Sequence, residues 1–135
     1  MEWICDNHAV TNEMIKLVEA QLNVEFPNDF RDNIKKYDGG YPMSSVVIVA
    51  GREEAINNLV SFVKGHTSYI LDIINDIEGF RDTGLIPIAE DPFGNLFCYS
   101  FKKETPEVVF WNHEDTNSYE YVCKNFAELI SLLRD

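Results

Sequence analysis

Two pairs of adjacent carboxylates stand directly after apolar runs that predict strands, a place where catalytic groups are often found. Glu90-Asp91 and Glu114-Asp115 occupy these positions, and His113 adds a further residue type that a small hydrolase uses as general acid or base. However, 23 acidic residues in a chain of 135 make adjacent acids common by chance. We expect Asp91 to stabilise a turn and Glu114-Asp115 to lie in a solvated loop. The sequence therefore predicts a protein that is not an enzyme.

The cysteines and histidines lack the spacing of a metal site or of a catalytic nucleophile. A zinc site needs four such ligands at short paired spacings, and the only close pair in the sequence is Cys5-x-x-His8. An HExxH motif opening at His113 fails because Asn117 stands in place of the second histidine. Cys98 lies in a hydrophobic run, where a thiol normally packs. We expect no catalytic residue, no metal and no cofactor.

The segment 85–96 predicts two strands joined by a tight turn. Asp91 suits the first position of a type I turn, Pro92 the second, where its ring fixes φ, and Gly94 the fourth. Short runs rich in β-branched and aromatic residues flank the turn, as expected for a β-hairpin. The turn would hold Asp91 and its neighbours at one end of a sheet.

Four helices are predicted from apolar periodicity and capping residues. The first covers Thr11 to Leu22 with Thr11 as N-cap, and Pro27 opens the second at a first helical position. Asp38-Gly39-Gly40 ends the second helix, since glycine readily adopts the left-handed conformation. The third carries apolar residues from Ile70 to Ile77 after a Ser68 cap and ends before Gly79, and the fourth begins at Asn125 with Glu128 completing a capping box.

The remaining apolar runs predict strands. Val46–Val49 is apolar on both faces, which indicates a strand covered on both sides. The run Ile56 to Val63 fits a strand or a helical turn, and we favour the strand. Further strands are expected at Ile86–Ala89, Leu96–Phe101, Val108–Trp111 and Glu120–Cys123. The fold class is therefore α+β: residues 1–135 form a single domain, with a mainly antiparallel sheet of about five to six strands and four helices packed around it.

Charge and composition restrict the partners. The formal net charge is −12, so the surface repels phosphate backbones and favours a basic partner over direct binding of nucleic acid. The N-terminal residues lack the basic segment and apolar run of a signal peptide, and no apolar run approaches the length of a membrane span. Three widely spaced cysteines fit a reducing compartment. We expect a cytoplasmic protein, not bound to a membrane, and favour a monomer.

Two segments of the chain resemble a known family. The string "LIPIA-x-DPFGN-L" from Leu85 to Leu96, and "V-x-FW-x-HE" from Val108 to Glu114, are similar to segments of the SUKH superfamily, named in part for the fungal Smi and Knr cell-wall regulators. The stretch from Leu22 to Gly40 is similar to the family's opening, in which a helix leads into an "NGG" turn. This chain has Asp38 where the family usually has Asn. The resemblance covers roughly residues 22–133.

The resemblance implies a binding scaffold without catalysis, and many bacterial members are immunity proteins that bind and silence a toxin. The expected partner is a cognate polymorphic toxin with a basic surface, often a nuclease, whose active-site region would be blocked. The alternative is a regulatory protein–protein interaction scaffold, as in the fungal relatives. Candidate partner-binding residues are loop acids and two aromatic residues: Asp38, Asp91, Phe93, Trp111, Glu114 and Asp115. For the aromatic residues we favour packing over partner binding: Phe93 is a lid over the core or an exposed anchor, and Trp111 is a core or rim residue rather than a binding hot spot.

Overall fold

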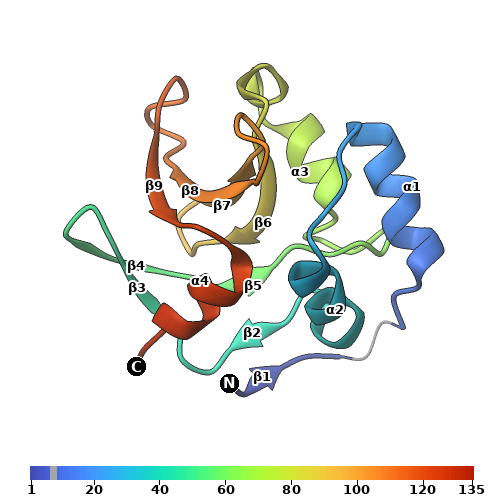
Figure 1. The fold of residues 1–135 in the computed structure, drawn as a ribbon, viewed down its shortest axis with the longest axis horizontal. Coiled ribbons are helices and arrows are strands. Elements are labelled where there is room, and N and C mark those ends of the chain that lie inside the picture. Colours follow the sequence, from blue (N-terminus) through green and yellow to red (C-terminus); the bar gives the residue numbers. More distant parts are fainter. Residues whose placement is uncertain (7–8) are drawn as a thin grey trace.

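The computed structural model describes residues 1–6 and 9–135, and it has the predicted α+β class. The helices are α1 (Asn12–Leu22), α2 (Asn28–Tyr37), α3 (Ile70–Asp76) and α4 (Phe126–Leu132), with a short 3-10 helix η1 (Phe80–Thr83) (Figure 1). The strands are β1 (Trp3–Ile4), β2 (Tyr41–Pro42), β3 (Val46–Val49), β4 (Arg52–Ala55), β5 (Asn58–Leu59), β6 (Ile86–Glu90), β7 (Leu96–Ser100), β8 (Glu107–Trp111) and β9 (Tyr119–Cys123).

A five-stranded antiparallel sheet forms the centre of the fold, in the order β5-β6-β7-β8-β9. Strands β6 to β9 are neighbours both in sequence and in the sheet, so each is joined to the next by a hairpin connection. The register pairs Glu90 with Leu96 and Leu96 with Trp111. This register brings the turn after β6 and the loop after β8 to the same end of the sheet, which positions the candidate site.

Every residue of β7 is buried, because helices and loops cover both faces of the sheet. On one side α3 packs against β6, and α4 packs against both α2 and β9. Phe30 of α2 lies 5.2 Å from Phe126 of α4 and 5.7 Å from Tyr99 of β7, measured between ring centroids. These edge-to-face contacts are the geometry that aromatic quadrupoles favour, and they tie the helices to the sheet.

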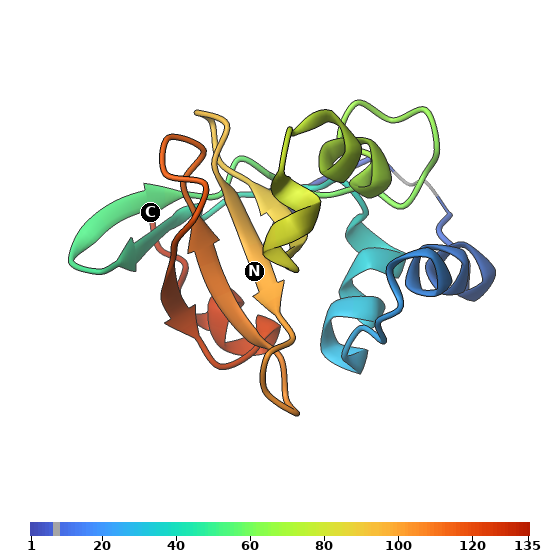
Figure 2. The ribbon, with the colours of Figure 1, turned by 90° about the horizontal axis from the view of Figure 1, so that it is seen from above.

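Two small antiparallel sheets flank the central one. Strand β1 pairs with β2, and β3 pairs with β4. The β3–β4 hairpin projects from the body on the side opposite α1, as both views show (Figures 1 and 2). Its strand β4 is polar, with the sequence Arg-Glu-Glu-Ala, and for this reason apolar periodicity did not predict it.

The predicted caps are confirmed at two helices. The Met14 N–H donates to Thr11 Oγ1 at the start of α1, and the Glu128 N–H donates to Asn125 Oδ1 at the start of α4. The second hydrogen bond of the predicted α4 capping box, from the Asn125 N–H to the Glu128 side chain, is wrong, because that side chain accepts from the N–H of Lys124 instead. Gly39 is left-handed after α2, with φ 68°, as predicted.

Several predicted boundaries need correction. Pro27 is the N-cap of α2 rather than its first residue, and Tyr69 rather than Ser68 is the N-cap of α3. Strand β3 is covered on one face only, because Ile48 is 45% exposed. Within 56–63, only Asn58 and Leu59 form a strand, β5. The chain then leaves the sheet, and Ser61 and Phe62 donate hydrogen bonds to the carboxylate of Asp38.

Buried thiols are confirmed at Cys98 and Cys123. Burial raises the pKa of Cys98 well above its usual value and that of Cys123 to about 12, which disfavours the reactive thiolate. Within residues 1–6 and 9–135, no group of three or more His, Cys, Asp or Glu side chains has a metal-binding arrangement. His8 of the Cys5-x-x-His8 pair lies outside these residues. None of the helices described here is long and apolar enough to span a bilayer.

Candidate partner-binding surface

The turn between β6 and β7 is organised by the carboxylate of Asp91. This side chain is 6% exposed and accepts hydrogen bonds from the Phe93 N–H at 2.8 Å, the Asn95 N–H at 2.7 Å and the Asn95 side-chain amide at 2.8 Å. The Asp91 N–H donates in turn to the Asn95 carbonyl at 3.0 Å. Gly94 has φ +90°, a conformation that glycine adopts without strain. The predicted turn role of Asp91 is therefore confirmed.

Asn95 connects this turn to the loop after β8. Its Oδ1 accepts a hydrogen bond from the His113 N–H at 3.1 Å and lies 2.7 Å from His113 Nδ1. Gly94 also packs beside the imidazole, which a Cβ atom at that position would meet at 3.5 Å. The hydrogen bonds from Asp91 through Asn95 to His113 thus join two loops that are adjacent in Figure 2. These residues belong to the two segments that predicted the family.

The loop between β8 and β9, residues 112–118, is held by its own hydrogen bonds. The Glu114 N–H donates to Asn112 Oδ1 at 2.8 Å, and Ser118 Oγ donates to Asp115 Oδ2 at 2.8 Å. The indole N–H of Trp111 donates to the Thr116 carbonyl at 3.3 Å. These bonds fix the backbone that carries Glu114 and the side chain of Asp115 before any partner arrives.

Phe93 is the most exposed large apolar side chain in the described part of the chain, at 75%. It projects from a rigid turn, in which the N–H groups of Phe93 and Asn95 both donate to the Asp91 carboxylate. The favoured alternative, in which Phe93 packs as a lid over the core, is therefore wrong, and its role as an anchor for a partner stays a prediction.

Acidic residues surround this turn. Asp72 and Asp76 of α3 line a cavity of about 310 Å³ together with Glu90, Gly94 and Asn95, while Glu114 and Asp115 follow His113 on the neighbouring loop. Among the described residues, none of these five acids forms an ion pair with Lys, Arg or His. We call the surface made by Phe93 and these acids the acidic end: Asp72, Asp76, Glu90, Phe93, Glu114 and Asp115.

A second group of acids is neutralised by arginines. Arg52 of β4 donates to Glu120 of β9 at 3.1 Å and to Glu54 at 3.2 Å, and Arg134 contacts Glu53 at 3.1 Å. The hydrogen bonds from Arg52 hold the pKa of Glu120 below its usual value. We call this group the paired-charge region, and it fastens the projecting β3–β4 hairpin to the last strand of the central sheet.

Three predicted partner-binding residues are buried, and the expectation that loop acids are exposed is wrong for two of them. Asp38 is 2% exposed, and its carboxylate accepts hydrogen bonds from Ser61 Oγ and the Phe62 N–H, both at 2.6 Å. The Asp91 carboxylate is taken up by the hydrogen bonds of its turn. Trp111 is fully buried and packs edge-to-face on Phe80 at 4.9 Å, as its alternative role in the core predicted. Both buried carboxylates accept hydrogen bonds from backbone N–H groups rather than from solvent.

Asp72 and Asp76 were missed by the sequence reasoning. They stand four residues apart, so they lie on the same face of α3, away from its buried isoleucines. The spacing was visible in the sequence. The proximity of these two acids to the Asp91 turn depends on the packing of α3 against β6, which the sequence did not predict.

Comparisons with known proteins identify the family of this chain. The profile of the SUKH_6 family, described as SMI1-KNR4 cell-wall, matches residues 12–130. The chain belongs to this SUKH family. It is also similar to the SPbeta prophage-derived uncharacterized protein YokK of Bacillus subtilis (strain 168), with 25% identity over 93% of this chain and 75% of that protein. The family match includes both loops of the acidic end.

Proposed function

We propose that this SUKH protein is a non-catalytic immunity protein that binds a cognate basic toxin, a nuclease domain, and silences it by covering its basic active-site region. The single observation that carries the proposal is the acidic end: five acids without ion pairs in the described chain, arranged around an exposed phenylalanine on a rigid turn. A nuclease must bind a polyanion, so its active-site region presents the opposite charge.

The acidic end combines two kinds of contact that such a partner needs. Clustered carboxylates increase the rate of encounter with a basic surface, and this effect falls as salt screens it. Phe93 offers a ring face for a lysine or arginine of the partner, a contact that gains strength when water is excluded. The hydrogen-bonded loops lower the entropy lost on binding, because they need little further ordering.

The prophage origin in the name of the similar Bacillus subtilis protein supports a bacterial setting, in which SUKH members typically act as immunity partners. The cell-wall description of the matched family favours the second candidate, a regulatory protein–protein interaction scaffold. The acidic end would serve either role. The two differ in the consequence of binding, since only an immunity protein abolishes a toxic activity.

Co-expression with a toxin-like domain, sought in the gene next to that of this protein, tests the proposal. We expect cells that carry both genes to survive, and the purified proteins to form a stoichiometric complex whose association slows as ionic strength rises. The control is the same toxin domain expressed with the Phe93→Ala variant, which should protect poorly. A toxin domain that binds the protein but remains active would support the regulatory scaffold, and absence of binding would contradict the immunity role.

A further inference from the structure

His113 lies where the two loops of the acidic end meet, and its side chain is exposed. Its backbone N–H donates to Asn95 Oδ1 at 3.1 Å, and its ring nitrogen Nδ1 lies 2.7 Å from the same oxygen. Among the residues that the structure describes, no other hydrogen bond or ion pair involves His113. The imidazole is therefore tied to the fold through one of its two nitrogens.

The position of the ring proton follows from the partners of Asn95. A backbone N–H can only donate, so the atom of Asn95 that faces His113 is the amide oxygen. The amide nitrogen faces the other way and donates to Asp91 Oδ2 at 2.8 Å. Because the amide oxygen carries no hydrogen, Nδ1 must supply the proton of the 2.7 Å contact. The neutral imidazole therefore has its proton on Nδ1 and an acceptor lone pair on Nε2.

The edge of the ring that carries Nε2 is directed away from the turn. A Cβ atom at Gly94 would be closest to Nδ1, Cε1 and Cγ of the imidazole, at 3.5, 3.7 and 3.8 Å. The Nδ1 edge therefore covers Gly94, and the opposite edge, with Nε2 and Cδ2, lies farther from the turn. Nε2 accepts no hydrogen bond within the described part of the chain. On an exposed side chain, this acceptor is left for a donor from outside the molecule.

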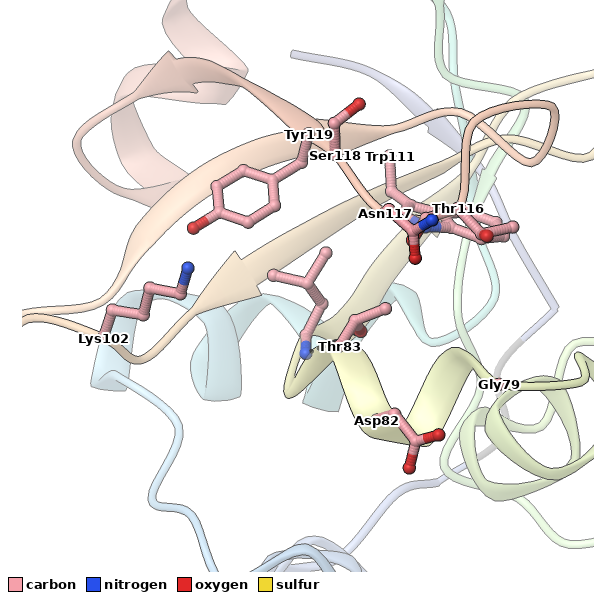
Figure 3. Close-up of a pocket in the computed structure, with 10 residues that line it drawn as sticks. Gly79, Asp82, Thr83, Lys102, Trp111, Thr116, Asn117, Ser118 and Tyr119 are labelled. Atoms are coloured by element: carbon pink, nitrogen blue, oxygen red, sulfur yellow. Dashed lines mark hydrogen bonds between the residues drawn. The ribbon is translucent and has the colours of Figure 1, made fainter.

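Both loops hold this acceptor in place before any partner binds. On one side, the Asn95 N–H donates to the buried carboxylate of Asp91 at 2.7 Å. On the other, the indole N–H of Trp111 donates to the Thr116 carbonyl at 3.3 Å, between two residues that Figure 3 draws. Solvated carboxylates attract cations from many directions, whereas a fixed lone pair accepts a donor from one direction. The ring can therefore discriminate among basic partners that charge alone would attract equally.

We propose that His113 is a specificity-determining contact of the acidic end, and that its Nε2 accepts a hydrogen bond from a lysine ammonium or arginine guanidinium group of the basic partner. This inference rests on the proposed function. It adds that the partner must present an N–H donor at this point, rather than positive charge alone. Asp91 and Asn95 are positioning residues, because they fix the tautomer through which His113 acts.

The free protein tests the tautomer. Long-range ¹H–¹⁵N spectra at pH 8, where histidine side chains are ordinarily neutral, distinguish a protonated from an unprotonated ring nitrogen. The His113 signals are assigned by their loss in His113→Asn. We expect the proton on Nδ1, and a proton on Nε2 would overturn the proposal.

Two peptides of equal side-chain charge then test the need for a donor. Hexalysine should shift the His113 Nε2 signal saturably, because its ammonium groups donate hydrogen bonds. A hexapeptide of trimethyl-lysine, which lacks these donors, should leave that signal almost unchanged. Equal responses to the two peptides, or no response to hexalysine, would contradict the proposed contact.

Two amide variants carry the test to the toxin domain. The asparagine of His113→Asn can replace only the Nδ1 contact, whereas the longer glutamine of His113→Gln places an acceptor near the position of Nε2. We expect His113→Asn to raise the dissociation constant about tenfold, the loss of one hydrogen bond to a charged group, and His113→Gln to bind nearly like the parent. Melting temperatures of both variants show whether they fold.

The outcomes separate this inference from the proposed function. Equal dissociation constants of folded His113→Asn, His113→Gln and the parent would overturn the role of His113 and leave the immunity proposal intact. A toxin domain that does not bind the parent protein would contradict the immunity proposal. In that case, the spectra of the free protein and of its mixtures with the two peptides decide the inference about His113.

Discussion

The acidic end and the paired-charge region contain the same residue types, yet their environments differ. In the paired-charge region, Arg52 and Arg134 neutralise Glu53, Glu54 and Glu120, and the charges fasten a projecting hairpin to the central sheet. At the acidic end, the carboxylates of Glu114 and Asp115 have no cation within ion-pair distance in the described chain. An excess of negative charge is thus divided between internal ion pairs and a surface that we propose attracts a basic protein.

A second difference concerns the backbone. The turn and loop of the acidic end are held by a buried carboxylate and an amide, Asp91 and Asn95, which fix the exposed residues around them. The β3–β4 hairpin is held by the buried Val47 and Val49 and by backbone hydrogen bonds between Val46 and Arg134, so its exposed ion pairs add little stability. The comparison teaches that acids with a structural role are buried or paired, whereas four of the five acids proposed to bind are exposed; the fifth, Glu90, is half-buried and accepts a hydrogen bond from Asn58.

The largest effect on stability is expected for Asp91→Ala. Removal of this carboxylate leaves the Phe93 and Asn95 N–H groups without an acceptor, so we expect the free energy of unfolding to fall by about 2–4 kcal/mol. Urea unfolding measures the change. Asp115→Ala, which removes an exposed acid with one local hydrogen bond, is the control and should cost far less. Equal stability of the two variants would remove the distinction between structural and exposed acids.

Phe93→Ala should weaken partner binding without affecting the fold. A phenylalanine that is 75% exposed contributes little to the core, so the melting temperature should remain within experimental error. Loss of an aromatic anchor costs about 2 kcal/mol or more at an interface, which corresponds to a dissociation constant raised about thirtyfold. Titration calorimetry with the toxin domain checks this. An unchanged dissociation constant would move the anchor away from the turn.

Gly94→Val tests the turn by its backbone alone. A β-branched residue at φ +90° is strained, and we expect a loss of about 1–3 kcal/mol in the free energy of unfolding. A Cβ atom at position 94 would lie at an ordinary contact distance from the His113 ring, so the loss of stability arises from the backbone rather than from a clash. The melting temperature of Gly94→Val is compared with that of Gly51→Val, which alters a left-handed glycine in the β3–β4 turn. A stable Gly94→Val would show that this turn tolerates another conformation.

The smallest effect is expected in the paired-charge region. Arg52→Gln removes the contacts to Glu54 and Glu120, but both partners are partly exposed and remain solvated. We expect a slightly lower melting temperature and faster amide hydrogen exchange limited to β3 and β4, with unchanged toxin neutralisation. Loss of neutralisation in a folded Arg52→Gln variant would place part of the interface on the hairpin.

The sequence predicted those parts of the molecule that depend on local chemistry. Turn residues identified the Asp91 turn, and caps identified the starts of α1 and α4. It failed where a carboxylate's role depends on distant chain: Asp38 is buried because residues 61 and 62 return to it, 23 and 24 positions later. Likewise, Asp72 and Asp76 join the candidate site only because α3 packs against β6. Polar strand β4 has no apolar pattern, so periodicity could not reveal it.

The central claim is that the acidic end, rather than negative charge in general, binds the basic toxin. The most direct test compares two double variants with the same change in net charge: Glu114→Lys with Asp115→Lys at the acidic end, and Glu13→Lys with Asp32→Lys on α1 and α2, on exposed positions across the molecule (Figure 1). Association rates with the toxin domain are measured at low salt, together with neutralisation and melting temperature. We predict that the acidic-end variant associates at least about tenfold more slowly and neutralises poorly, while the α1–α2 variant loses much less and both melt normally. Full neutralisation by a normally folded acidic-end variant would contradict the account.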